Sequence, residues 1–366
     1  MSKTKILTIV FACILFSSSV ASAQIRTVLV SPVPGDPIAS GTNLRNALAN
    51  ISSPSSTNRW LLKIEPGIYQ LQGNALAMRP WVDIEGSGIG VTTIQLSSPT
   101  SPGVPTISGA SNTELRLLTV EATGNAVAMF NSSAHPRIYR VKFVVQTNLT
   151  QAWAMQNLLS APRIEECEFI VSINAGSSIA TGVSFIDLPG GVRSSILRSR
   201  IMVSGATTNY GVHMFRGQTV TEIQETQIDV TGGSSSSGYG IYALGGDWLG
   251  SETLELRNVR IKSASSSQAF GILLEANTSV WPDISHSRIE AVGALVTKGI
   301  FQGGSPAVVI QSSRISGLTK AVETTTASFS IQSSALFGGP TTGGGWNGCM
   351  GVWDENGMFY TTGCPQ

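Results

Sequence analysis

Apolar side chains recur along the chain at a regular distance and in the same local arrangement. The anchor of each repeat is an isoleucine or leucine between polar residues: Leu115, Ile138, Ile164, Ile196, Ile223, Leu256, Ile284, Ile310 and Ile331. From Ile138 to Ile331 the intervals average roughly 27 residues. A period of this length indicates a solenoid in which each repeat forms one coil stacked on the next.

Each repeat also has a fixed pattern after its anchor. The third residue is small or apolar: Val141, Cys167, Ser199, Thr226, Val259, Ser287, Ser313 and Ser334. The fifth residue is always apolar: Phe143, Phe169, Ile201, Ile228, Ile261, Ile289, Ile315 and Leu336. We expect two short strands with a bend between them, which bury the anchor, third and fifth positions and turn the second and fourth towards water.

A second apolar series occupies the other half of each repeat. Its anchors are Val127, Trp153, Val183, Val212, Ile241, Ile272, Ile300 and Val322. From Val183 to Ile300 a glycine precedes each anchor, as expected where one turn geometry recurs in every coil and requires a residue without Cβ. The sequence therefore predicts an all-β fold, a single-stranded right-handed parallel β-helix.

The two ends of the chain differ from the repeats. Residues 1–23 have a charged head, a short apolar middle and a small-residue exit, which are typical of a secretory signal peptide, and the apolar run is too short for a permanent membrane span. We expect a periplasmic or extracellular protein after cleavage near Ala23. Residues 24–62 are expected to hold a short capping helix with Leu44, Ala47, Leu48 and Ile51 on one face. Residues 63–338 then form the β-helix and residues 339–366 the C-terminal cap.

Three cysteines follow the predicted signal peptide. Cys349 and Cys364 are close in sequence, and in an oxidising compartment their spacing predicts a disulfide that closes a β-hairpin with its turn at residues 355–357. Two free thiols are the alternative. The repeat places Cys167 in the interior as a small apolar residue.

Composition limits the classes of partner. Without Lys3 and Lys5, the 23 basic residues become 21 against 22 acidic ones, so the mature chain is nearly neutral and lacks the concentrated basic face that nucleic acid requires. Charged residues make up 12% of the chain, about half the usual fraction. Because no His-rich or Cys-rich metal spacing is present, we expect no metal and no cofactor.

The early repeats resemble a known family. The stretch KIEPGIYQLQGNALAMRPWVDIEGSGIGVTTIQL (63–96), followed by ELRLLTVE (114–121), is similar to the opening coils of bacterial right-handed β-helix proteins of the pectate-lyase-like superfamily. That superfamily includes pectate and pectin lyases, pectin methylesterases, polygalacturonases, phage depolymerases and adhesins. The resemblance implies a pectin-lyase-like solenoid and favours a carbohydrate partner, but it does not identify an activity.

The catalytic motifs of these enzymes are incomplete in this chain. Arg260, Ile261 and Lys262 match an R-I-K element of polygalacturonases, yet the paired aspartates and the G-H-G motif are missing. No two aspartates of the mature chain are adjacent, unlike the calcium-binding carboxylates of pectate lyases. The histidines at 135, 213 and 286 have no recognisable triad partners.

The second and fourth positions of the first series carry charges that alternate in sign from one repeat to the next. Arg140 and Lys142 are followed by Glu166 and Glu168, a pattern typical of a ladder that fixes the register of stacked coils. The alternation stops further along, where Arg260, Arg288 and Arg314 are expected to align beside His286. Such a row can bind carboxylates or sulfates of an acidic glycan, although solvated arginines are the simpler interpretation.

The second series places large side chains one residue after its anchors. These are expected on the outer surface, with others nearby in the chain: His213, Tyr242, Leu273 and Phe301, with Phe215, Arg216, Asp247 and Trp248. Exposed aromatic rings on a rigid ladder can stack on sugars. Asp187 and Asp247 are the carboxylates best placed to act as acid or base if catalysis occurs.

Two functions remain open at this point. The first is a secreted or surface-exposed β-helix that binds a polysaccharide or cell-surface glycan, or that has a structural or adhesin-like role, without an identifiable catalytic site. The alternative is a polysaccharide lyase or glycosidase that acts on an extracellular glycan. The oligomeric state is not indicated by the sequence.

Overall fold

The computed structural model describes residues 25–364 with short gaps. The gaps are at 100, 102, 125, 175–177, 189, 218–219, 234, 245–251, 276–279, 294, 305–306, 326–327, 339–340, 342–346 and 362–363. The predicted signal peptide lies outside the described residues. Within the described ranges, no helix is long and apolar enough to cross a membrane.

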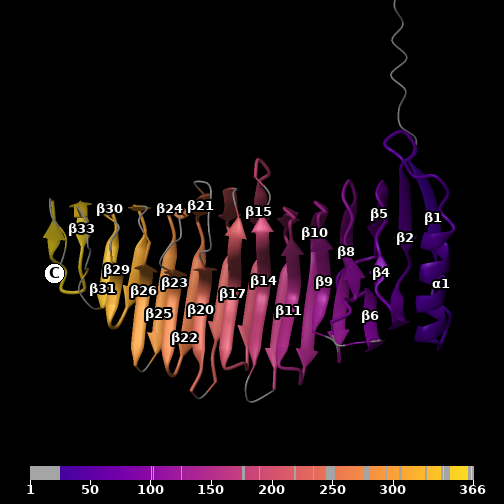
Figure 1. Cartoon of the computed structure of the whole chain (residues 1–366), viewed down its shortest axis with the longest axis horizontal. Helices are drawn as coiled ribbons and strands as arrows, with labels where there is room; N and C mark the ends of the chain where they lie inside the picture. The colour runs from indigo at the N-terminus through magenta and orange to yellow at the C-terminus, as the bar shows by residue number, and fades with distance from the viewer. Residues whose placement is uncertain are drawn as a thin grey trace, which may run out of the picture.

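Each complete coil contributes three strand segments that stack in parallel on those of the next coil (Figure 1). The first wall contains β1 (Arg26–Val30), β2 (Trp60–Ile64), β5 (Val82–Glu85), the first halves of β8 (Glu114–Thr123) and β10 (Arg137–Thr147), β12 (Arg163–Glu165), β15 (Ser194–Leu197), β18 (Val220–Gln224), β21 (Glu252–Arg257), β24 (Val280–Ser285), β27 (Val308–Gln311), β30 (Phe329–Gln332) and β32 (Asn347–Met350). The second wall contains β3 (Gly67–Gly73), β6 (Thr92–Pro99), the second halves of β8 and β10, β13 (Glu168–Ile173), β16 (Arg200–Ser204), β19 (Gln227–Thr231), β22 (Arg260–Ser265), β25 (Arg288–Gly293), β28 (Arg314–Gly317), β31 (Ala335–Gly338) and β33 (Val352–Trp353).

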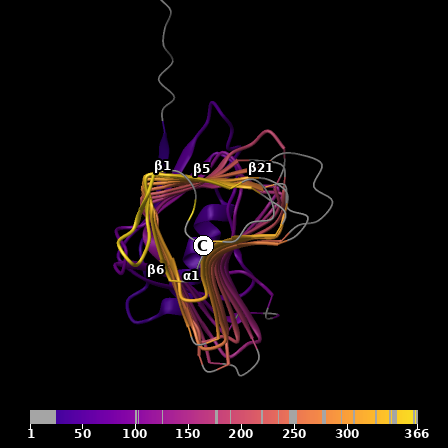
Figure 2. The same ribbon diagram turned by 90° about the vertical axis from the view of Figure 1, so that its left-hand side faces the viewer.

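The third wall is a separate sheet of ten parallel strands. It contains β4 (Leu76–Ala77), β7 (Ile107–Ser108), β9 (Val127–Ser132), β11 (Gln151–Leu158), β14 (Ile179–Leu188), β17 (Thr208–Gly217), β20 (Ser237–Leu244), β23 (Gln268–Leu274), β26 (Val296–Gln302) and β29 (Lys320–Thr324). Viewed along the stack, the coils lie over one another around one interior (Figure 2). The predicted parallel β-helix is therefore confirmed.

The interior follows the first repeat series closely. Each anchor pairs with the anchor of the next coil, as Ile138 does with Ile164 and Ile164 with Ile196, and each is fully buried. The fifth positions pair in the same way, and the rings of Phe143 and Phe169 stack at 5.1 Å. Each apolar column contains one buried side chain from every coil. Residues one period apart in the sequence are therefore stacked on one another in the core.

The bend between the first two walls is held by a buried polar column. The second residue after each anchor has a left-handed backbone, for example Arg140 at φ 52° and Glu166 at φ 53°. The third residue satisfies the backbone there: Ser199 Oγ accepts from the N–H of Cys167 at 3.1 Å and donates to the carbonyl of Leu197 at 2.9 Å. Cys167 belongs to the same column, and burial raises the pKa of its thiol to about 12. It is therefore an interior residue, as predicted, and not a nucleophile.

Both ends of the stack are covered. Helix α1 (Pro37–Ala49) lies at the N-terminal end (Figures 1 and 2) and buries Leu44 and Leu48 against the core. Its N-cap is Asp36, whose side chain accepts from the N–H of Ala39 at 2.9 Å. At the other end, β33 pairs with β34 (Phe359–Tyr360) as an antiparallel hairpin, and Cys349 is bonded to Cys364. The predicted helix and disulfide are both present.

Candidate functional site

The strands of the third wall bend at a column of small residues. The column includes Gly182, Gly211, Gly240, Gly271 and Gly299. A Cβ at any of these positions would overlap an isoleucine of the second wall, such as Ile261 at Gly240. As predicted, these positions have no room for a Cβ, but the predicted turn is wrong. The glycines lie within strands such as β14 and β17, where the third wall approaches the second across the interior.

The bend makes the outer side of this wall concave (Figure 2). Tyr210 and His213 lie on either side of Gly211, and their rings meet at 4.9 Å with planes 18° apart. On a straight strand, residues separated by three positions point to opposite faces. The bend at the glycine therefore brings side chains of two strand segments together on one outer surface.

Aromatic side chains occupy this surface on several successive coils. We call the set the aromatic cluster: Tyr210, His213, Tyr239, Tyr242, Phe270 and Phe301. The rings of Tyr210 and Tyr239 stack at 5.2 Å, and those of Tyr239 and Phe270 at 5.5 Å. The register pairs His213 with Tyr242, Tyr242 with Leu273 and Leu273 with Phe301, so the structure places these residues in one column.

The cluster is more enclosed than the sequence suggested. Only 9% of Tyr242 and 7% of Leu273 are exposed, whereas His213, Tyr210 and Phe301 are half-buried. The expectation of a fully exposed ladder is wrong, because rings on adjacent coils cover one another's faces. A sugar can meet ring edges within the cluster and ring faces only at its ends.

Electrostatics keep the centre of the cluster neutral. Burial lowers the pKa of His213 to about 4 and raises that of Tyr210 to about 12. Burial also raises the pKa of Tyr242, and its hydroxyl donates to Glu275 at 2.6 Å, which raises the pKa further. At the C-terminal end, Lys298 lies 4.2 Å from the ring centre of Phe301. At neutral pH the rings therefore form an uncharged surface bordered by charged groups.

Two buried hydroxyl groups lie on the coil that precedes the N-terminal end of the cluster. Thr181 pairs with Tyr210, and Ser184 pairs with His213, on the preceding coil. Both small side chains are fully buried, and neither hydroxyl has a hydrogen-bond partner among the residues that the structure describes. A buried hydroxyl without a partner costs about 1–3 kcal/mol, so two adjacent ones indicate a place where a ligand can supply the missing bonds.

Trp153 lies on the coil that precedes these two hydroxyl groups. It pairs with Thr181, so Trp153, Thr181 and Tyr210 form one column over three coils. With coils about 4.8 Å apart, the backbones that carry the two aromatic residues are roughly 10 Å apart. That separation accommodates a sugar ring stacked between two aromatic rings, each pair at the usual centroid distance of about 4.5–5 Å.

The prediction that Trp153 is an interior anchor equivalent to Val183 is wrong. Val183 pairs with Met155, and Trp153 lies two positions earlier, on the outer surface. The same shift applies to Val127, which pairs with Trp153. The error has a simple reason: the residue at the bend of this coil is Ala154, so the glycine that marks the later anchors is absent.

The remaining candidates of this wall lie at its outer edge. Asp187 and Arg216 form an ion pair at 3.9 Å, and the side chain of Asp187 is 39% exposed. The guanidinium of Arg216 also lies 4.6 Å from the ring centre of Phe215. Asp187 therefore contacts a cation, whereas hydrolysis of a glycosidic bond generally uses two carboxylates across the bond. Asp247 and Trp248 lie outside the described residues.

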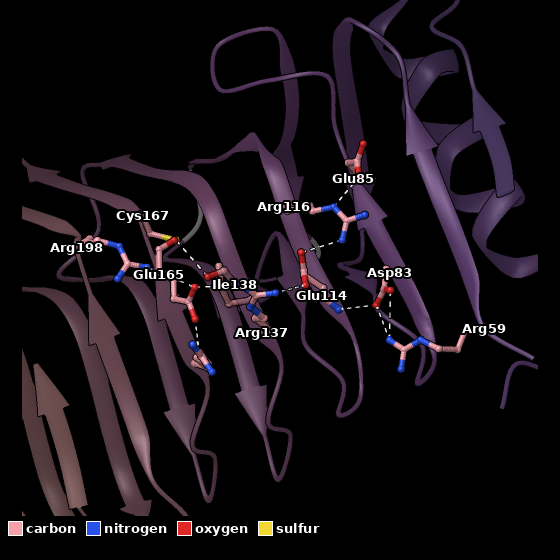
Figure 3. Close-up of polar contacts among 11 residues, drawn as sticks. Arg59, Asp83, Glu85, Glu114, Arg116, Arg137, Ile138, Glu165, Cys167 and Arg198 are labelled. Carbon is pink, nitrogen blue, oxygen red and sulfur yellow. Dashed lines mark hydrogen bonds and ion pairs between the residues drawn. The ribbon is translucent and has the colours of Figure 1, made fainter. Parts of the chain in front are cut away.

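On the opposite side, charged residues of the first two walls form ion pairs between coils. Glu114 accepts from Arg116 at 2.8 Å and from Arg137 at 3.0 Å, and Arg137 continues to Glu165 (Figure 3). Burial alone would raise the pKa of Glu165, but hydrogen bonds from Arg137 and Arg163 lower it below its ordinary value. This network stabilises the stacking of coils.

The predicted alternating ladder is part of the same surface. Glu166 pairs with Arg140 at 2.8 Å and with Arg198 at 3.5 Å, and Lys142 pairs with Glu168 at 3.1 Å. Opposite charges thus alternate along successive coils, as expected. This part of the surface has a structural role.

The arginine row is also where the sequence placed it. Arg260 pairs in register with Arg288, and Arg288 with Arg314, and all three are exposed. Arg288 has an ion pair with Glu290 at 3.1 Å, and the guanidinium of Arg314 lies 4.2 Å from the ring centre of Phe337. Three like charges therefore occupy neighbouring strands.

Two open clefts lie away from the aromatic cluster. One of about 580 Å³ is lined by polar residues near the turns after the second wall, among them Gln146, Asn148 and Asn174. The other, of about 670 Å³, is lined by Arg257, Asn258, Asp283, Ser285, His286 and Gln311. Among the residues that the structure describes, no group of three or more histidine, cysteine or acidic side chains is arranged to hold a metal ion.

No protein-family model matches the chain, and the search of curated proteins found no match. Among solved structures, it is similar to the A-modules of two mannuronan C-5 epimerases from Azotobacter vinelandii, with 14% and 15% identity, TM-scores of 0.48 and 0.46, and coverage of 88% of this chain and 89% and 87% of theirs. A pectin methylesterase from carrot gives 12% identity and a TM-score of 0.32 over 59% of this chain and 77% of its own. These values carry no argument about function. The resemblance seen in the sequence concerns the fold, which the chain's own strand pairing establishes.

Proposed function

We propose that this protein is secreted and binds an extracellular polysaccharide through the concave outer side of its third wall, without cleaving it. The observation that carries the proposal is the column of Trp153, Thr181 and Tyr210, in which two aromatic side chains flank a buried hydroxyl that has no partner in the described part of the chain. Rigid aromatic faces for stacking, with a few fixed polar groups, are the usual components of a sugar site.

In the proposed complex a pyranose ring lies between Trp153 and Tyr210. Its C–H faces contact the two aromatic rings, and its hydroxyl groups bond to Thr181 and Ser184. Because neither protein hydroxyl is exposed in the free protein, the flanking rings rotate to admit the sugar. Trp153 and Tyr210 are only half-buried, so this rotation does not disturb the interior of the coils.

The rest of the aromatic cluster extends the site along the axis of the stack. Coils about 4.8 Å apart repeat at roughly the length of one sugar unit. An extended glycan that lies along the axis therefore meets a new coil with each unit. The outer groups Glu275 and Lys298 can bond its hydroxyl groups, which makes the site suited to a polymer rather than to a single sugar.

The disulfide bond of the chain supports secretion. The disulfide between Cys349 and Cys364 is stable in an oxidising compartment, and the predicted signal peptide leads to one. A rigid, extended β-helix with a glycan site on one side is suited to attachment at a surface, which is the adhesin-like role considered above. We propose binding without cleavage because the catalytic motifs of the related enzymes are incomplete in this chain.

The test uses the chain from Gln24 onward and a panel of neutral and acidic polysaccharides. Affinity, new reducing ends and unsaturated products are measured in the same samples. We expect binding without products, and about tenfold weaker binding for Trp153→Ala or Tyr210→Ala, as the loss of a ring contact worth up to about 1.4 kcal/mol implies.

Tyr139→Ala is the matched control, because Tyr139 is a half-buried tyrosine on the opposite side that contacts Arg137 and Arg140. Its affinity should remain unchanged. Equal losses in all three variants would refute the assigned surface. Products that disappear in Asp187→Asn would instead establish the alternative, a lyase or glycosidase.

A further inference from the structure

The outer column of the second wall changes its charge pattern along the stack. In register, it contains Lys142, Glu168, Arg200, Gln227, Arg260, Arg288 and Arg314. The first three alternate in sign, and Lys142 and Glu168 are bonded at 3.1 Å. The last three are all positive. The same column therefore has alternating charges in the earlier coils and only positive charges in the later ones.

The positive part of the column is unfavourable for the isolated protein. Like charges directly opposite on neighbouring strands destabilise a sheet, and the first coils show that this position accepts acids. Arg288 is compensated by Glu290, but Arg260 has no ion pair within the part of the chain that the structure describes. Lys262, the next outward residue on the same strand, pairs in register with Asp229 on one side and with Glu290 on the other, so its charge is compensated where that of Arg260 is not.

The groups in this row have the chemistry of an anion site. A guanidinium presents a planar fork of donors that matches a carboxylate or sulfate, and it remains charged at every physiological pH. All three arginines are exposed, so their donors are accessible. Their spacing of about 4.8 Å repeats at roughly the length of one sugar unit, which corresponds to one acidic group per unit of an extended glycan.

We infer that Arg260, Arg288 and Arg314 form a second binding site, for an acidic polysaccharide that lies along the axis of the stack. This strip is on a different wall from the aromatic cluster and does not depend on it. The cleft lined by Arg257 and His286 lies across the bend from the strip and can receive the hydroxyl groups of the same chain. The two surfaces together allow one protein molecule to bind two glycans, or two parts of one.

The inference predicts opposite effects of one substitution on binding and on stability. Arg260→Glu places an acid between Gln227 and Arg288 and beside Lys262, so it restores the alternation and should leave the melting temperature unchanged or higher. Its affinity for polygalacturonate should fall at least tenfold. Binding by the unchanged protein should weaken with added salt, because exposed ion pairs are screened.

The matched control is Arg200→Glu, which makes the same change of charge in the same column, at an arginine that lies 3.7 Å from Asp229. It should change the affinity less than twofold. Equal weakening by both variants, or no binding of polygalacturonate by the unchanged protein, would overturn the inference. So would binding of a single-stranded DNA oligonucleotide with the same dependence on Arg260.

Tyr210→Ala separates this site from the proposed aromatic one. It should retain the affinity for polygalacturonate. Loss of that affinity in Tyr210→Ala, together with its retention in Arg260→Glu, would assign acidic glycans to the aromatic cluster and would refute the second site alone.

Discussion

Thr181→Val offers a direct way to separate binding from stability at the concave wall. Thr181 is fully buried, and its hydroxyl has no partner within the described ranges, so the folded protein loses hydration there without a compensating bond. Valine has nearly the same shape and an equal or higher preference for strands. Removal of the hydroxyl should therefore raise the free energy of unfolding by about 1–3 kcal/mol.

The same substitution should weaken glycan binding, because the hydroxyl is proposed to bond the ligand. A lost hydrogen bond worth about 1 kcal/mol corresponds to a roughly fivefold weaker affinity. Urea unfolding followed by far-UV circular dichroism measures the first effect, and calorimetric titration with the best-binding polysaccharide measures the second. The two effects are expected to have opposite directions.

Thr226→Val is the control for this reasoning. Thr226 is equally buried, but its hydroxyl donates to the carbonyl of Gln224 at 2.8 Å and accepts from the N–H of Ser199 at 3.2 Å. Its loss leaves buried backbone groups unpaired and should lower the free energy of unfolding by about 1–3 kcal/mol. If Thr181→Val destabilises the protein as much as Thr226→Val does, the account of an unpaired hydroxyl is refuted.

Three further predictions concern the bend, the aromatic cluster and the cap. Gly240→Ala should lower the free energy of unfolding by about 1–3 kcal/mol, because its Cβ overlaps Ile261, and the near-UV circular dichroism of the cluster should change with it. Burial lowers the pKa of His213 from 6.5 to about 4, so below pH 6.5 the unfolded chain binds a proton that the native state does not. The free energy of unfolding should therefore fall by at most about 2 kcal/mol from pH 7 to pH 5. Urea unfolding at both pH values measures this fall, which His213→Gln should reduce. Replacement of Cys349 and Cys364 by serine removes a cross-link over 15 residues and should destabilise the cap by about 3 kcal/mol, which hydrogen exchange of the hairpin would detect.

The interior of the β-helix was predictable because its repeat is strict. Each coil needs one apolar side chain at the anchor and one at the fifth position, and Ile138 and Phe143 belong to columns that extend to the coils before and after them. The small third residue was equally informative, since Cys167 and Ser199 occupy the column that the sequence assigned to them. Periodicity predicts burial well when a position in every repeat accepts only one kind of side chain, apolar or small.

The outer surface was less predictable, because it depends on contacts between coils. The sequence predicted the correct column for Tyr242 but did not predict that its side chain is enclosed. The enclosure follows from the bend at Gly240 and from the rings on neighbouring coils. The sequence does not reveal that Trp153 lies outside, because Ala154 replaces the glycine that marks the bend in later coils. The unpaired hydroxyl of Thr181 left no signal in the sequence, since a threonine in a strand is ordinary.

The most direct test of the proposed function is a crystal structure of the mature protein with an oligosaccharide of the polysaccharide that binds best in the panel. The account predicts a sugar ring between Trp153 and Tyr210, with a hydroxyl group within hydrogen-bond distance of Thr181 or Ser184. A water molecule that occupies this place while the sugar binds elsewhere would contradict it.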